Sequence, residues 1–336
     1  MPADSLYLLR APASTSRQTP RHGLHGWVEA ICLARAALGK PLPLADAMGI
    51  SATAFRAYFF SPDDNHAYRD DFPGVEWLED TLELENYGVH EAVSAHTASD
   101  IRLYDRLRRA PFLQLIRHEL TAGRPLLLTD PLTMLTWVVV GLGDLRLSLA
   151  PVACTEESFD PDDEHCLRLA LSALRPTERP FTYRPDHFRR VALGWSGEHL
   201  NTKHELFHHL EIFVASGARA LEVAAATCER EWGVGPGGNP AFASFFVAWV
   251  EELAWARALA VDYLRGWAAE ASAQDEPMTT AAALAPVIEA ARVTAEQTAA
   301  AIAALLSDDG AGCAKALREA AASERQTVAA VSAALA

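Results

Sequence analysis

The sequence is poor in cysteine, in basic residues and in long apolar runs. Its five cysteines are scattered and form no CxxC pair, so they favour a reducing cytoplasm over a disulfide framework or a zinc knuckle. Lysine and arginine number 29 against 44 aspartates and glutamates, and the net charge of −15 disfavours nucleic acids and anionic membranes as partners. No uninterrupted apolar run reaches the about 18 residues of a membrane span. We therefore expect a cytoplasmic protein.

What remains is the composition of a globular protein of 336 residues, half of them hydrophobic, which is long enough for two domains. Residues 1–23 are expected to be a flexible lead-in, and residues 24–150 mix helical with strand-like patterns. Residues 151–198 are rich in proline and predict a linker with one short helix around 165–174. Residues 199–336 predict a helical bundle. The expected fold class is therefore α+β.

The N-terminal half predicts one helix and two strands. Trp27–Leu38 has apolar residues at helical spacing and stops at Gly39, which is a common residue just after a helix. Pro125–Thr129 and Thr136–Leu142 are short apolar runs, and the second contains three consecutive valines, which favours a buried strand.

The C-terminal half predicts helices throughout. The first is expected over Asn201–Glu231, because a capping residue starts it and a glycine-rich loop follows it. Apolar residues three or four apart between Phe242 and Ala260 indicate a core stripe, with a pocket for an apolar ligand as the alternative. Two alanine-rich helices are expected at about 279–306 and 312–335, and they are the expected interface if the protein is a homodimer.

Three short segments agree in order and spacing with a known family. They are Met48–Arg56 (MGISATAFR), Leu120–Leu126 (LTAGRPL) and Thr136–Gly141 (TWVVVG). With the helix that ends at Gly39, they resemble papain-like bacterial proteins related to the butirosin-biosynthesis acyltransferase and to bacteriocin-leader cysteine peptidases. The resemblance covers roughly residues 20–150. It implies a papain-like N-terminal domain and a role connected with natural-product biosynthesis.

The residues that would carry the family's chemistry are replaced. Gly26, preceded by His25, stands where the resemblance places the nucleophilic cysteine, and Thr136 stands where it places the general-base histidine. Neither side chain can form a thiolate–imidazole pair. Cys32 lies six residues further along the helix, about 120° around it, and is expected to be a core thiol.

The expected function is thus that of a catalytically degenerate papain-like protein, a pseudoenzyme without a cofactor. Its expected partner is a small molecule, a peptide or an acyl carrier. Two other functions stay open at this point. One is an enzyme, either an amide-forming acyltransferase with relocated residues or a metal-dependent hydrolase, and the other is a structural dimer.

The metal alternative rests on one HExxH motif. On a helix, His204 and His208 would share a face and bind zinc, Glu205 would act as base on a metal-bound water, and Glu211 would extend the ligand set. Lys203 beside the first histidine disfavours a metal, as does the motif's position at the start of the expected helix. The alternative interpretation is a polar His/Glu face.

Overall fold

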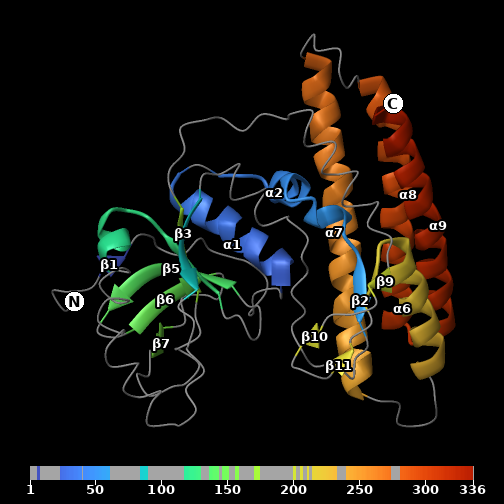
Figure 1. Cartoon of the computed structure of the whole chain (residues 1–336), viewed down its shortest axis with the longest axis horizontal. Helices are drawn as coiled ribbons and strands as arrows, with labels where there is room; N and C mark the ends of the chain where they lie inside the picture. The colour runs from blue at the N-terminus through green and yellow to red at the C-terminus, as the bar shows by residue number, and fades with distance from the viewer. Residues whose placement is uncertain are drawn as a thin grey trace. The chain divides into compact units, whose positions relative to one another are not determined.

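The computed structural model describes fifteen segments of the chain. They are residues 6–7, 23–39, 41–60, 84–89, 117–129, 136–143, 146–150, 156–158, 170–174, 200–201, 205–206, 210–211, 214–232, 240–273 and 281–335. The chain forms two compact units, one made of Met1–Ala47 and His66–Pro180, the other of Met48–Asn65 and Phe181–Ala336. The first holds an antiparallel sheet with a helix and the second is mostly helical (Figure 1). The fold class is α+β.

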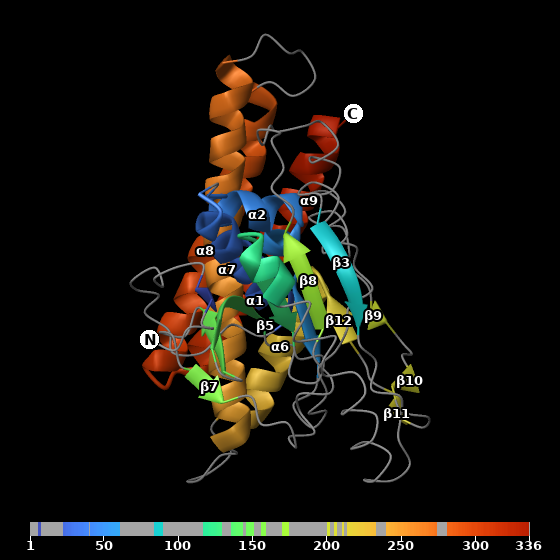
Figure 2. The same ribbon diagram turned by 90° about the vertical axis from the view of Figure 1, so that its left-hand side faces the viewer.

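The sheet of the first unit has the strand order β3-β8-β4-β5-β6-β7, and β1 also pairs with β5. All its pairings are antiparallel, and Figure 2 shows β8 and β3 side by side. The strands are β1 (Leu6–Tyr7), β3 (Leu84–Val89), β4 (Leu126–Thr129), β5 (Thr136–Gly143), β6 (Arg146–Ala150), β7 (Glu156–Ser158) and β8 (Ala170–Leu174). The expected strands at 125–129 and 136–142 are confirmed as the adjacent pair β4 and β5.

Helix α1 (Gly23–Ala37) packs against β4 and β5 and confirms the helix expected there. One face of the helix, including Val28, Ile31 and Ala34, is fully buried. Leu126 and Val139, which are register partners on β4 and β5, are fully buried as well. The helix ends as expected before Gly39, whose φ of +69° belongs to the left-handed region that glycine adopts without strain.

The prediction of a short helix around 165–174 is wrong for residues 170–174, the part of this range that the structure describes. Ala170–Leu174 is strand β8, which pairs with β3 on one side and with β4 on the other. Five small and apolar residues satisfy either local conformation, and the two neighbouring strands select the extended one. Strands β7 and β8 belong to the sheet, so residues 151–198 are not simply a linker.

Four helices dominate the second unit, as expected for the C-terminal region. They are α6 (Ala218–Glu231), α7 (Pro240–Ala273), α8 (Ala281–Leu306) and α9 (Gly310–Leu335). The two alanine-rich helices expected near 279–306 and 312–335 are confirmed as α8 and α9, which pack along each other. Buried Ala291, Ala301, Ala314 and Ala320 allow this close packing.

The expected start of the helical region at residue 201 is wrong. The strands β9 (Leu200–Asn201), β10 (Glu205–Leu206), β11 (Leu210–Glu211) and β12 (Val214–Ser216) precede α6. Strand β12 pairs with β2 (Tyr58–Phe60), and the Gly217 N–H donates to the Ala57 carbonyl at 2.7 Å. Gly217, at φ +59° and ψ −146°, makes the turn from strand to helix in a conformation open essentially to glycine alone.

Residues 48–60 pack on the helices, which differs from the expected domain boundaries of 24–150 and 199–336. Helix α2 (Leu44–Ile50) leads into the 3-10 turn η1 (Thr53–Phe55) and then into β2. Ring centroids of Phe59 lie 5.9 Å from those of Phe246 and 4.9 Å from those of Trp249, both on α7. The aromatic stripe is therefore core, and burial of this segment's apolar side chains is what moves the boundary.

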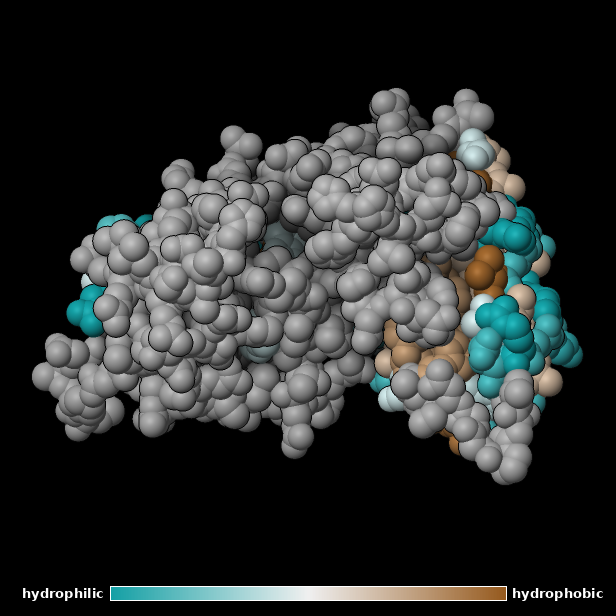
Figure 3. All heavy atoms as spheres, turned by 60° about the horizontal axis from the view of Figure 1, so that its bottom comes forward, coloured by the Kyte–Doolittle hydropathy of each residue, from teal (hydrophilic) through white to brown (hydrophobic). Residues whose placement is uncertain are grey.

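On the face drawn in Figure 3, the described part of the helical unit shows hydrophilic residues with hydrophobic patches between them. Leu306 is the one large hydrophobic side chain among the described residues that is mainly exposed, at 75%. Within the described part of the chain, no helix combines the length and apolar character needed to cross a membrane.

Candidate functional site

The first turn of α1 holds the position that the family resemblance assigns to the nucleophile. Gly26 is buried there, and His25 beside it is partly buried. A helix start is where backbone N–H groups favour a thiolate, so the location suits a papain-like nucleophile. Glycine supplies no sulfur or oxygen, and the position itself therefore has no nucleophilic atom.

The position assigned to the general base is the first residue of β5. Thr136 is 1% exposed and lies opposite Thr129 of β4. Since α1 packs against β5, the elements that carry the two positions are neighbours in the same unit. A threonine hydroxyl does not take a proton near neutral pH, so no base for thiol chemistry stands here.

Cys32 does not replace the missing nucleophile. Burial raises the pKa of its thiol to about 12, and the nearby carboxylates of Glu29 and Asp46 act in the same direction, against a smaller opposing effect of Arg35. At neutral pH the thiol is protonated. Because the thiolate is the reactive species, Cys32 is a poor nucleophile at neutral pH.

Alkylation kinetics test this assignment. At pH 7–8 we expect iodoacetamide to modify Cys32 about a thousandfold more slowly than an ordinary cysteine, because the thiolate fraction falls tenfold for each unit of pKa. The rate should keep rising with pH toward about 12. Peptide mapping after timed quenching measures it, with the unfolded protein as reference. A plateau below pH 9 in the folded protein would contradict the assignment.

The described residues of the HExxH motif, Glu205 and Leu206, form a strand and not the helix on which the metal interpretation depends. Glu205 lies on β10 and Glu211 on β11, and the two are directly opposed in an antiparallel pair. His204 and His208 lie outside the described residues. A shared metal-binding face of His204 and His208 stays a prediction, and the backbones of Glu205 and Glu211 lie opposite each other. Among the residues that the structure describes, no group of three or more His, Cys, Asp or Glu side chains is placed to hold a metal.

A buried arginine that was not predicted from the sequence donates hydrogen bonds to the segment Met48–Arg56. The Arg257 side chain, on α7, donates from Nη1 to the carbonyls of Ala54 and Arg56, at 2.7 and 3.1 Å. Its Nε donates to Oε1 of Glu324 on α9 at 2.7 Å, and Nη2 donates to the same oxygen. Both charged side chains are 1% exposed. We call this set the Arg257 clamp.

Tyr263, six residues further along α7, packs against the same segment. Its ring fills the space beside Gly49, where an added Cβ would lie 2.2 Å from two ring carbons. The ring centroid of Phe55 lies 6.1 Å away. The MG–AF pattern thus describes packing on the helical unit, and none of these contacts provides a reacting group.

A signal for the clamp was present in the sequence. Arg257 follows Leu253 by four residues and precedes Ala260 by three, so it sits inside the apolar stripe of α7. A charged residue at a core position of a helix needs a buried partner. The partner, Glu324, is 67 residues away, and no spacing rule links the two.

Comparisons with known proteins do not assign this chain to a family. No protein-family model matches the sequence, and no curated protein is detectably similar to it.

Proposed function

We propose that the protein is a catalytically degenerate papain-like protein that binds a small molecule, a peptide or an acyl carrier as an accessory to natural-product biosynthesis. One observation carries the proposal. The helix and the strand that bear the two degenerate positions, α1 and β5, pack together in an antiparallel α+β unit. Gly26 and Thr136 each stand at the start of their element.

With both the nucleophile and the base replaced, a reaction through a covalent acyl-enzyme intermediate is not available. Enzymes that lose one member of a catalytic set keep some rate through oxyanion stabilisation and binding. Without a nucleophile and a base, no thioester can form, and the protonated Cys32 thiol is not an alternative nucleophile. What a papain-like unit retains in this condition is the capacity to bind an acyl or peptidyl group without turning it over.

Restoring the two residues tests the assignment. In Gly26→Cys/Thr136→His we expect the new thiol to react with iodoacetamide at pH 6 at least about tenfold faster than in Gly26→Cys alone, since an adjacent imidazolium lowers a thiol pKa by one unit or more. The rate is measured as a function of pH by peptide mapping. Circular dichroism and thermal melting establish that both variants fold.

The outcomes separate the scaffold from the function. Equal pH profiles in the two folded variants would show that positions 26 and 136 do not face each other and would overturn the papain-like assignment. In the unmodified protein we expect no thiol-dependent hydrolysis or acyl transfer on activated esters and peptides, with Cys32→Ala matching it. Thiol-dependent turnover that disappears in Cys32→Ala, with folding intact, would overturn the degenerate assignment.

A further inference from the structure

Two cysteines from distant parts of the chain meet inside the helical unit. Cys228 lies in the last turn of α6 and Cys313 in the first turn of α9, and both are fully buried as free thiols. Both residues belong to the same buried core cluster. The Cys228 thiol also lies 3.5 Å from the Gly310 carbonyl, to which it donates. The two cysteines are 85 residues apart in the sequence and lie on two different helices.

The pair lies directly beneath the surface. Its neighbours in sequence, Glu229 and Ala311, are exposed, and Gly312 is partly exposed. No residue of the first turn of α9 before Cys313, Gly310–Gly312, has a side chain larger than a methyl group. A small oxidant reaches the sulfur atoms through a local opening of that turn and of Trp232, which packs on Gly310.

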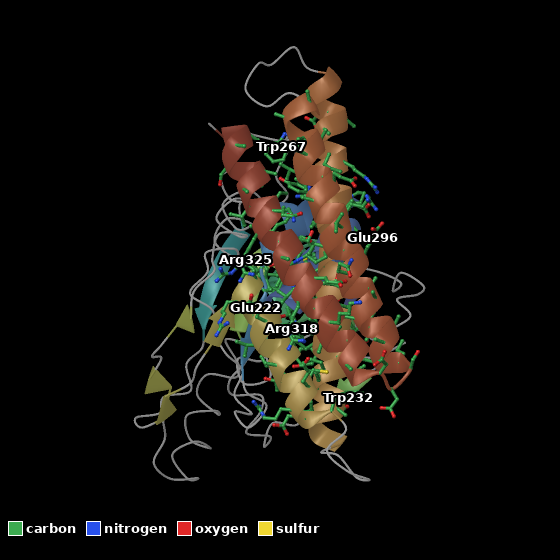
Figure 4. The ribbon with its side chains drawn as sticks, turned by 90° about the vertical axis from the view of Figure 1, so that its right-hand side faces the viewer. Glu222, Trp232, Trp267, Glu296, Arg318 and Arg325 are labelled. Carbon is green, nitrogen blue, oxygen red and sulfur yellow. The ribbon has the colours of Figure 1, made fainter. Side chains whose placement is uncertain are left out.

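The surrounding contacts hold the two helix ends in place. Trp232, which follows α6, donates from Nε1 to Asp308 at 3.1 Å and packs over Gly310. Glu229 pairs with Arg318 of α9, and Glu222 with Arg325, so α6 and α9 are joined along their length (Figure 4). These bonds keep the two thiols together while the side chains rotate.

We propose that Cys228 and Cys313 are a redox-active dithiol, which closes reversibly to a disulfide between α6 and α9 when it meets a hydroperoxide. The Cys228 thiol touches Gly310, the first residue of the turn of α9 that also holds Cys313. A disulfide has a sulfur–sulfur distance of about 2.05 Å, so closure requires side-chain rotation and a small approach of the two helix ends. The site lies in the helical unit and does not depend on the proposed function.

The reaction balances in two steps. The Cys228 sulfur attacks the hydroperoxide, the O–O bond breaks, an alcohol or water leaves, and a sulfenic acid forms on Cys228. The Cys313 sulfur then attacks the Cys228 sulfur, the S–O bond breaks and water leaves. Two thiols lose two electrons, and the hydroperoxide gains them. The contact with Cys313 lowers the pKa of Cys228, whereas the same contact and burial raise the pKa of Cys313, which favours Cys228 as the attacking thiol.

The test uses the full chain with hydrogen peroxide as the probe. Before any blocking of thiols, we expect the oxidised protein to be about 2 Da lighter than the reduced one. After the remaining thiols are blocked, a proteolytic fragment should link the Cys228 and Cys313 peptides. Dithiothreitol should reverse both. Because the bond closes a long loop, the oxidised protein should melt about 5–10 °C higher than the reduced one.

Matched variants assign the bond. Cys32→Ser/Cys154→Ser/Cys166→Ser keeps only the two proposed residues and should still lose about 2 Da, whereas Cys313→Ser should not. The peptide map of the unmodified protein decides the matter if a variant fails to fold. Two free thiols at 228 and 313, under conditions that fully oxidise glutathione, would overturn the proposal. A crosslink from either residue to another cysteine would overturn it too.

Discussion

Replacing Arg257 by alanine is expected to lower the free energy of unfolding of the helical unit by about 3–5 kcal/mol, the cost typical of breaking a buried ion pair from one side. The change removes the guanidinium from a site that is 1% exposed. It removes the N–H groups that donate to the buried Glu324 carboxylate and those that donate to the backbone carbonyls of Ala54 and Arg56. Chemical denaturation followed by circular dichroism measures the loss.

Two further variants make the Arg257 experiment specific. Arg257→Lys keeps the charge but lacks the planar fork that reaches Glu324 and the carbonyls together, so it should fall between the native protein and Arg257→Ala. Arg318→Ala removes an arginine on α9 whose ion pair with Glu229 is solvent-exposed, and its effect should be a small fraction of the Arg257 loss. Equal losses at 257 and 318 would show that the clamp contributes no more than a surface pair.

Gly49→Ala is expected to destabilise the protein by about 1–3 kcal/mol, the usual range for an overpacked core, and Gly49→Val by more. The added methyl would lie 2.2 Å from the Tyr263 ring. That ring is fully buried between Phe55 and Trp267, with centroid distances of 6.1 and 5.9 Å, and has little room to turn aside. Alanine in a helix is ordinarily favoured over glycine by up to about 1 kcal/mol, and here the collision outweighs that gain.

A double-mutant cycle separates collision from backbone effects at Gly49. In Gly49→Ala/Tyr263→Ala the ring is absent, so the new methyl should cost nothing further, and the combined loss should be smaller than the sum of the single losses by about 1 kcal/mol or more. Thermal melting of the four proteins gives the coupling. Strict additivity would mean that Gly49 and Tyr263 do not touch in solution. That result would contradict the packing of residues 48–60 on α7.

Several elements were predictable because local patterns are sufficient for them. The helix that stops before Gly39, the valine-rich strand that starts at Thr136 and the helices α7 to α9 follow from periodicity, capping and turn residues. The absence of a nucleophile at Gly26 and of a base at Thr136 is likewise a property of the sequence. Its relevance to function rests on the resemblance and remains a proposal.

Other elements were decided by pairing between distant segments. A helix was expected from Asn201 because of its capping residue, yet Val214–Ser216 is extended because it pairs with Tyr58–Phe60. Ala170–Leu174 is extended because strands on both sides bond to it. In both cases the local preference is weak, and the hydrogen bonds of a sheet outweigh it.

The sequence by itself determined the composition class, the long helices and the absence of a thiol at position 26 and of an imidazole at position 136. Only the tertiary structure decided that Met48–Phe60 belongs with the helical unit, that Arg257 finds Glu324, and that Cys228 meets Cys313. The reason is physical. Periodicity records which face of an element is buried, whereas the identity of the partner depends on how remote segments fill one core, and residues 67 to 203 positions apart carry no mark of each other.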